Sequence, residues 1–467
     1  MTTGQPNYRK FFGLKLITDR KFYQQVLRMM LPVALQQAIN IGVNMMDTIM
    51  LGAMGEAQLS ASSLANSYYN IFTILCMGII GGCSVLAAQY WGANNKEKAR
   101  ETFNLAIKLA IILSFLFTVL TALFPRQIMA LYSNEADVID FGVRYLNITT
   151  FIFLFHGTSQ VAAFLMRSVH QPKLGLRVSI ISFVVNVFFN WVFIFGQLGA
   201  PRMEIAGAAL GTLIARVTEF IVTYVYILVI DKDLGLRLRH ILPLPSRELV
   251  YNYFRLGIAA LFSDGLLGFG FTAINMILGR MGSVVVAANA ICQVVERLFT
   301  VIVSGVSNAS GIITGNSVGR GDRDTAMIQG QTFYLLSVVF GVFCAALVLV
   351  FGRVSLSFYK LDEATVIIAK EMMLAYSLIT FFHSTQNIMT KGVLRGGGDT
   401  RFLLVADVLF LWIVSLPLGC LAGLVLGAPA WVTILCLRID WAIKTFWCLG
   451  RLLKGTWIHG TKKLPSE

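Results

Sequence analysis

Long apolar runs, separated by short polar stretches, divide this chain of 467 residues. Most runs reach about 20 residues, the length at which an α-helix crosses the hydrocarbon core of a bilayer. Apolar and polar residues do not alternate within the runs, as they would in the strands of a membrane barrel. Because a backbone in lipid must satisfy its own hydrogen bonds, the runs predict an all-α integral membrane protein of about twelve transmembrane helices. They lie near residues 26–50, 60–88, 103–125, 142–167, 174–196, 205–231, 254–278, 284–315, 333–356, 367–394, 402–426 and 429–451.

The composition argues against a soluble protein and against a nucleic-acid-binding one. Hydrophobic residues make up 56% of the chain and charged residues only 13%, whereas soluble domains average about 25% charged residues. The net charge is +14. Because the sequence offers no soluble domain that could present a basic face, we expect the charge to lie in basic loops and expect no nucleic-acid partner. The seven cysteines form no CxxC pair and lie almost entirely in apolar runs, which predicts neither a disulfide nor a metal cluster.

The positions of the basic residues predict the orientation of the chain. Loops on the side of the N-terminus are rich in Lys and Arg, whereas the opposite loops are poor in cations or acidic, as at Glu135, Asp137 and Asp140. Cytoplasmic loops carry an excess of Lys and Arg, so we expect both termini in the cytoplasm. The predicted segments are a cytoplasmic N-terminal tail (1–25), an N-lobe of six helices (26–231), a cytoplasmic linker (232–253), a C-lobe of six helices (254–453) and a cytoplasmic C-terminal tail (454–467).

An internal repeat relates the two halves of the chain. The segment LGAMG at 51–55 returns as LGRMG at 278–282, and QYWGANNKEKA at 89–99 aligns with NSVGRGDRDTA at 316–326. Both alignments share one offset of 227 residues. The chain is therefore predicted to contain one six-helix bundle twice. Because six is even, both bundles insert the same way up, and their pseudo-twofold axis runs along the membrane normal, as in many secondary transporters.

The ordered motifs of this duplicated chain resemble the multidrug and toxic compound extrusion (MATE) transporters. The resemblance covers essentially the whole chain and rests on MMDTIMLGAMG (45–55), AAQYWGA (87–93), NVFFNWVFIFG (186–196), INMILGRMG (274–282) and GVLRGGGDTR (392–401). It implies a secondary transporter, not an enzyme, in which two lobes alternate to export organic, often cationic, drugs or toxins in exchange for Na⁺ or H⁺. It implies no organic cofactor. We expect a monomer in a bacterial inner membrane.

Polar residues inside the first six runs predict an ion site. Asn40, Asn44 and Asp47 share one face of a helix, and Asn186 and Asn190 are one turn apart on another. With Thr212 they offer one carboxylate and several neutral oxygens, which suits a hard cation such as Na⁺ at Asp47, Asn186 and Asn190. The carboxylate could instead carry a proton. The alternative is that Asp47 only caps its helix and the asparagines only bridge helices.

The resemblance places the MATE ion site at these positions, with Asp47 matching the aspartate of the family's first helix. Some branches have a second aspartate where Asn190 stands, and an asparagine there resembles the NorM-like branch. The choice between Na⁺ and H⁺ therefore stays open.

In the second half, four residues are candidates for substrate binding or secondary ion coupling: Asp264, Glu296, His383 and Gln386. Asp264 resembles the carboxylate of the family's C-lobe and could attract cationic substrates, although the run at 367–394 lacks a second acid near Gln386. The alternative for Asp264 is a hydrogen bond to a neighbouring helix. Asp407 is interpreted as structural and His156 as a core residue. Arg216 with Glu219, and Asp440 with Lys444, are predicted to neutralise each other.

Two other functions fit parts of the pattern. A flippase for lipid-linked oligosaccharides would share the duplicated fold but needs a cavity rich in Arg and Lys. A membrane enzyme acting on lipids needs clustered His and Asp or Ser side chains, whereas the five histidines are scattered. The sequence contains no Walker motif, so we do not expect ATP to be the energy source.

Overall fold

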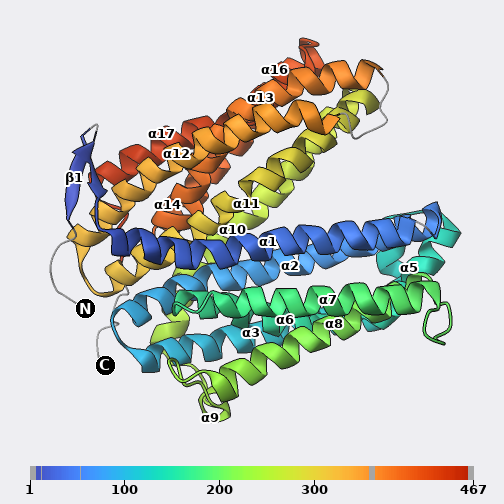
Figure 1. The fold of residues 1–467 in the computed structure, drawn as a ribbon, viewed down its shortest axis with the longest axis horizontal. Coiled ribbons are helices and arrows are strands. Elements are labelled where there is room, and N and C mark those ends of the chain that lie inside the picture. The colour runs from blue at the N-terminus through green and yellow to red at the C-terminus, as the bar shows by residue number, and fades with distance from the viewer. Residues whose placement is uncertain (1–6, 12, 53, 357–362, 461–467) are drawn as a thin grey trace. The chain divides into compact units, whose positions relative to one another are not determined.

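The computed structural model describes residues 7–460 apart from 12, 53 and 357–362, and helices dominate it (Figure 1). The first half contains α1 (Arg20–Gly52), α2 (Glu56–Gly92), α3 (Lys96–Leu123), α4 (Pro125–Ala130), α5 (Ala136–Thr149), α6 (Ile152–Ser168), α7 (Lys173–Phe195) and α8 (Ile205–Val225), which continues as a π-helical turn (Tyr226–Ile230). After the short α9 (Leu238–Ile241), the second half contains α10 (Arg247–Arg280), α11 (Ser283–Gly319), α12 (Arg323–Ser355), α13 (Glu363–Asn387) with a π-helical extension (Ile388–Leu394), α14 (Thr400–Asp407), a π-helical stretch (Val408–Ser415), α15 (Leu416–Cys420), a second such stretch (Leu421–Val425), α16 (Ala430–Leu437) and α17 (Ile439–Lys454).

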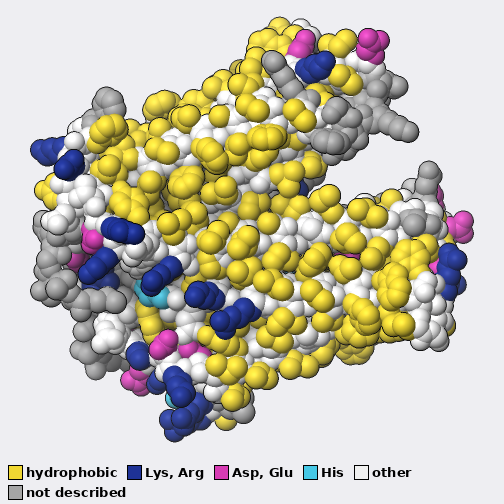
Figure 2. Space-filling view, viewed as in Figure 1, with side chains coloured by type: hydrophobic (Ala, Val, Ile, Leu, Met, Phe, Trp, Pro, Cys, Tyr) yellow, Lys and Arg dark blue, Asp and Glu magenta, His cyan; other side chains and the backbone are white. Residues whose placement is uncertain are grey.

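The helices have the length and surface of membrane spans. Among the described residues, ten helices are long and apolar enough to cross a membrane, and α5 with α6, bent by 58°, makes up to an eleventh. Large apolar side chains such as Phe115, Val342 and Leu374 are more than half exposed. Figure 2 shows hydrophobic side chains along the visible flanks of the helices, with most Lys and Arg near helix ends. Lipid is the solvent that such flanks require, which confirms the all-α membrane fold.

The last predicted run, 429–451, is divided at one charged residue. Arg438 leaves the helical conformation with φ −117° and ψ 12°, which separates α16 from α17. Its guanidinium lies 4.5 Å from the ring centroids of both Phe271 and Trp441. A cation inside an apolar run must find polar or aromatic partners, and the break brings Arg438 to such partners.

The described residues of the predicted N-terminal tail (1–25) contain a β-hairpin and the first residues of α1. Strands β1 (Tyr8–Phe11) and β2 (Leu14–Ile17) pair antiparallel, and α1 begins at Arg20. The backbone N–H of Ile17 donates to Thr332 on α12 at 3.1 Å, and Ile17 itself is buried. An apolar strand end that packs on α12 thus holds the hairpin, a detail that helical periodicity could not predict.

Contacts between helices divide the chain into two compact units. We call Leu35–Ala87 with Lys96–Tyr253 the first unit, and Met1–Ala34 with Ala88–Asn95 and Phe254–Glu467 the second unit. Within the first unit, α7 packs along α8, and α6 packs against α3 and α8.

Repeat-related residues meet each other within the second unit. Gly92 at the end of α2 lies against Asn316 of α11, and Gly319 of α11 lies against Gln89 of α2. A Cβ on Gly92 would lie 2.1 Å from the carbonyl oxygen of Asn316, and one on Gly319 would lie 1.9 Å from that of Gln89. Gln89 and Asn316, like Gly92 and Gly319, are 227 positions apart. The two helix ends therefore cross in a pseudo-symmetric contact that only glycine permits.

The chain after α17 covers this crossing. Gln89 donates its amide to the backbone carbonyl of His459 at 3.1 Å.

Arg451 of α17 donates to Asp399 at 2.7 Å. Burial alone would raise the pKa of Asp399, but hydrogen bonds from His459 and Arg451, together with the charge of Arg451, outweigh burial and lower the pKa. Asp399 is thus held in its charged form.

Candidate functional site: a polar cavity in the first unit

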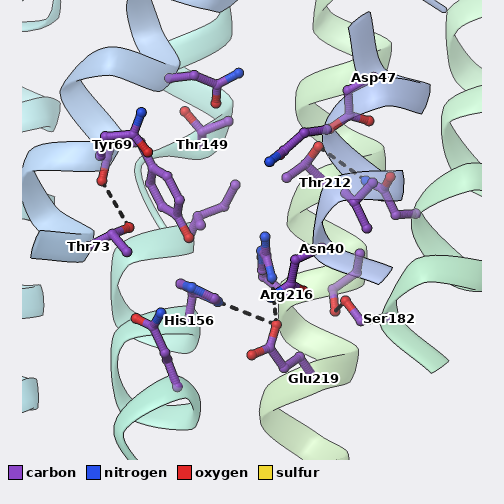
Figure 3. Close-up of a pocket in the computed structure, with 18 of the residues that line it drawn as sticks. Asn40, Asp47, Tyr69, Thr73, Thr149, His156, Ser182, Thr212, Arg216 and Glu219 are labelled. Carbon is purple, nitrogen blue, oxygen red and sulfur yellow. Dashed lines mark hydrogen bonds and ion pairs between the residues drawn. The ribbon is translucent and has the colours of Figure 1, made fainter. Parts of the chain in front are cut away.

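A cavity of about 740 Å³ lies within the first unit and is lined by α1, α2, α5, α6, α7 and α8 (Figure 3). Its wall mixes amide, hydroxyl and charged side chains with aromatic ones such as Tyr145 and Phe153. Pockets for drug-sized ligands have volumes of about 300–1,000 Å³. The cavity is therefore large enough for an organic molecule as well as an ion.

The predicted ion-site residues come together in this region. Asn190 on α7 donates its amide to Asp47 on α1 at 2.7 Å, and to Asn186 at 3.4 Å. Asn186 in turn donates to Thr212 on α8 at 3.4 Å. Asn40, two turns before Asp47 on the same face of α1, lines the same cavity. A chain of hydrogen bonds thus links Asp47 on α1 through Asn190 and Asn186 on α7 to Thr212 on α8.

The close approach of α7 and α8 makes this arrangement possible. Gly211 of α8 faces Asn190, and a Cβ there would lie 2.2 Å from Asn190 Oδ1. That oxygen is buried and has no hydrogen-bond partner among the described residues. A cation beside Asp47 would supply the partner that a buried amide oxygen requires.

Arg216 and Glu219 also line the cavity, a position that the sequence analysis did not predict for them. Glu219 Oε2 accepts a hydrogen bond from Arg216 at 2.7 Å and lies 3.3 Å from His156 Nδ1, while Ser159 donates to Oε1 at 3.3 Å. The predicted Arg216–Glu219 pair is confirmed, and His156 is buried. A signal was available: Thr212, Arg216 and Glu219 follow spacings of four and three, so they share one face of α8.

Asp264 in the second unit is paired rather than open. Arg395 donates from Nη2 to Oδ1 at 2.9 Å and from Nη1 to Oδ2 at 3.1 Å, so each carboxylate oxygen has a guanidinium partner. Arg395 follows the π-helical extension of α13. Such a bidentate pair neutralises the carboxylate, and the geometry matches the reading of Asp264 as a link between neighbouring helices.

The other second-unit candidates, Glu296, His383 and Gln386, lie at or next to a small cavity. Glu296 on α11 lies 2.7 Å from His383 Nδ1, and the His383 ring stacks on Trp441 at 4.2 Å. His383 and Gln386 line a cavity of about 40 Å³ with Lys444. A cavity needs about 10–15 Å³ of such space to hold one water, so this one has room for a few waters and not for an organic substrate.

A buried lysine connects two acids beside the small cavity. Lys444 Nζ lies 2.7 Å from Asp407 and 3.0 Å from Asp440, and all three side chains are at least nine-tenths buried. Ser263 of α10 donates a hydrogen bond to Asp407. The predicted Asp440–Lys444 pair is confirmed, and Asp407 is its third member, which supports its structural interpretation.

A family model described as MatE matches residues 32–192 and 260–421, which together make up more than half of the chain. The chain belongs to the MatE family. Curated relatives include "Multidrug resistance protein NorM" of Vibrio vulnificus, 23% identical over 88% of this chain and 89% of its own length. Another is "Multidrug resistance protein MdtK" of Yersinia enterocolitica, 22% identical over 90% of this chain and 96% of its own length.

Solved structures show the same fold. An outward-facing multidrug resistance MATE family transporter superposes with a TM-score of 0.83 at 16% identity, over 93% of this chain and 97% of its own. A MOP superfamily transporter from Pyrococcus furiosus superposes with a TM-score of 0.82 at 16% identity, over 93% and 96% of the two chains. The resemblance to MATE transporters is thus confirmed, and this MatE protein is a multi-pass membrane transporter and not an enzyme.

Proposed function

We propose that this MatE transporter exports organic small molecules in exchange for Na⁺ or H⁺, through the cavity of the first unit. The curated relatives are named multidrug resistance proteins, which supports drugs or toxins as substrates. One observation carries the coupling: Asp47 lines a cavity of organic size together with Asn186 and Thr212, to which Asn190 links it by hydrogen bonds. In this proposal, ion and substrate therefore bind in the same cavity.

Exchange follows from competition between two states. An ion that binds Asp47 removes its net negative charge and competes with Asn190 for the carboxylate. If the ion prefers the state that opens outward and the substrate prefers the state that opens inward, each shifts the population against the other. Two lobes that alternate between these states would move substrate out as the ion moves in. The basic loops favour an inner-membrane protein with both termini in the cytoplasm.

The charge balance of the cavity disfavours the flippase alternative. Its wall carries two guanidinium groups, Arg167 and Arg216, and two carboxylates, Asp47 and Glu219. A site for a lipid-linked pyrophosphate needs an excess of cations, because phosphate recognition rests on positive charge. Equal numbers of the two charges suit a smaller ligand of lower charge.

The test is gradient-driven flux in proteoliposomes that contain the purified protein. Sodium and proton gradients are imposed separately, and wild type is compared with Asp47→Asn. We expect one gradient to drive substrate flux in the wild type. Asp47→Asn should abolish the response, because the variant has no carboxylate to bind the cation or the proton. The gradient that works identifies the ion.

The matched control is Asp137→Asn, an exposed carboxylate on the first turn of α5, which should leave flux unchanged. Full coupling in Asp47→Asn would refute the proposed ion site. The absence of any response to either gradient, across several drugs, would refute antiport and favour the flippase.

A further inference from the structure

The two charges of the Arg216–Glu219 pair are not equally available to a ligand in the cavity. Glu219 is already engaged by Arg216, His156 and Ser159, and its side chain is 10% exposed. The Arg216 side chain is 25% exposed and donates through Nη1. A guanidinium has five N–H donors, so Arg216 retains donor capacity on the cavity side, whereas Glu219 has little acceptor capacity left for a cation.

A second donor lies in the same wall. The hydroxyl of Tyr69 on α2 is buried and has no hydrogen-bond partner within the described part of the chain. The Tyr69 ring lies 5.7 Å from the His156 ring. Figure 3 shows the Tyr69 hydroxyl end and the Arg216 guanidinium extending into one space from α2 and α8. Buried hydroxyls almost always have a partner, and a ligand with acceptor oxygens would supply it.

The fixed charges also disfavour a purely cationic ligand once the coupling ion is bound. With an ion on Asp47, the remaining wall charges are Arg167, Arg216 and Glu219, and they sum to one positive charge. An additional cation would then meet a wall of net positive charge, in which Glu219 is already paired with Arg216. Before the ion binds, the wall holds two guanidinium groups and two carboxylates; Asp47 is the carboxylate that takes the coupling ion in the proposed function, and Glu219 is already paired with Arg216.

We propose that the transported molecule carries a carboxylate or similar anionic group, which Arg216 binds with the help of the Tyr69 hydroxyl. Aromatic side chains such as Phe153 and Phe164 line the same cavity and would hold an apolar body. The substrate class is therefore zwitterionic or anionic organic molecules rather than the cations that the family resemblance implies. This inference rests on the proposed function, because it names the substrate of that cavity.

The test uses two dyes that differ by one charge. A xanthene dye with a free carboxylate is compared with its methyl ester, which keeps the cationic ring system and loses the negative group. Binding to the detergent-purified full chain is measured by fluorescence polarisation. We expect wild type to bind the carboxylate dye about tenfold or more tightly than the ester, the effect of a charge-assisted pair of hydrogen bonds.

Four variants locate the preference. Arg216→Gln should abolish it, and Arg216→Lys should keep part of it, because lysine retains the charge without the planar fork. The double variant Arg216→Gln/Glu219→Gln avoids an unpaired carboxylate, and should also lose the preference if the guanidinium is the cause. Tyr69→Phe should reduce it by roughly fivefold through the loss of one donor. Arg126→Gln, an exposed arginine outside the cavity, is the control and should change nothing.

Two results would overturn the inference: equal or tighter binding of the ester by wild type, or a carboxylate preference that survives in the double variant. Flux of both dyes under ion gradients is measured in parallel. Failure of both dyes to move would count against transport, while the binding preference would still decide whether Arg216 selects an anionic group.

Discussion

At the scale of single residues, the geometry of the candidate ion site depends on a missing side chain as much as on those present. Sequence spacing predicted that Asn186 and Asn190 share a face, and the structure places Asn190 at 2.7 Å from Asp47, 143 positions away. The spacing could not show that Gly211 makes room for Asn190, because that contact joins two helices.

Gly211→Ala should therefore impair ion coupling without replacing a candidate ion ligand. The new Cβ would lie 2.2 Å from Asn190 Oδ1, so Asn190 must shift and its bond to Asp47 must weaken. We expect the half-saturating concentration of the coupling ion to rise by about fivefold or more, equivalent to roughly 1 kcal/mol. The measurement is ion-dependent flux in proteoliposomes.

Gly42→Ala is the matched control, since a Cβ on Gly42 of α1 meets no described atom within 4 Å. An unchanged ion dependence in Gly211→Ala would show that Asn190 does not position Asp47.

At the scale of helices, the repeat is expressed as a physical contact. Gly92 and Gly319 occupy equivalent positions in the two halves. Gly92 packs against the backbone of Asn316, three residues before Gly319, and Gly319 packs against that of Gln89, three residues before Gly92. The sequence showed the equivalence, but not the contact, because a repeat offset says nothing about which copies touch.

Gly92→Ala and Gly319→Ala should each destabilise the protein by roughly 1–3 kcal/mol, the usual cost of overpacking. Their Cβ atoms would lie 2.1 Å and 1.9 Å from backbone oxygens that cannot rotate away. Thermal unfolding of each variant in detergent measures the loss.

A second repeat-related pair supplies the control. Gly52 and Gly279 are also equivalent, and a Cβ on either meets nothing described closer than 4.0 Å. Their alanine variants should be neutral or slightly stabilising, because alanine favours helix over glycine. Equal stability of all four variants would refute the close crossing.

At the scale of the whole molecule, antiport requires a measurable antagonism between ion and substrate. If the two ligands prefer different states, each must weaken the other's equilibrium binding by the same factor. We expect a saturating coupling ion to weaken substrate affinity about fivefold or more, within the usual range of coupling energies of about 1–3 kcal/mol. Titrations of each ligand with and without the other test this, and no effect, or mutual strengthening of binding, would contradict exchange through two states.

The sequence by itself determined that this is a helical membrane protein with a repeated architecture, because runs of spanning length and residue periodicity are local properties. It also determined the pairs within one helix, such as Arg216 with Glu219 and Asp440 with Lys444. Only the tertiary structure decided which faces meet. Asp264 is neutralised by Arg395, 131 positions away, and Asn190 contacts Asp47 because α8 has glycine where it packs on α7. Partners of this kind depend on the packing of whole helices, which no local pattern encodes.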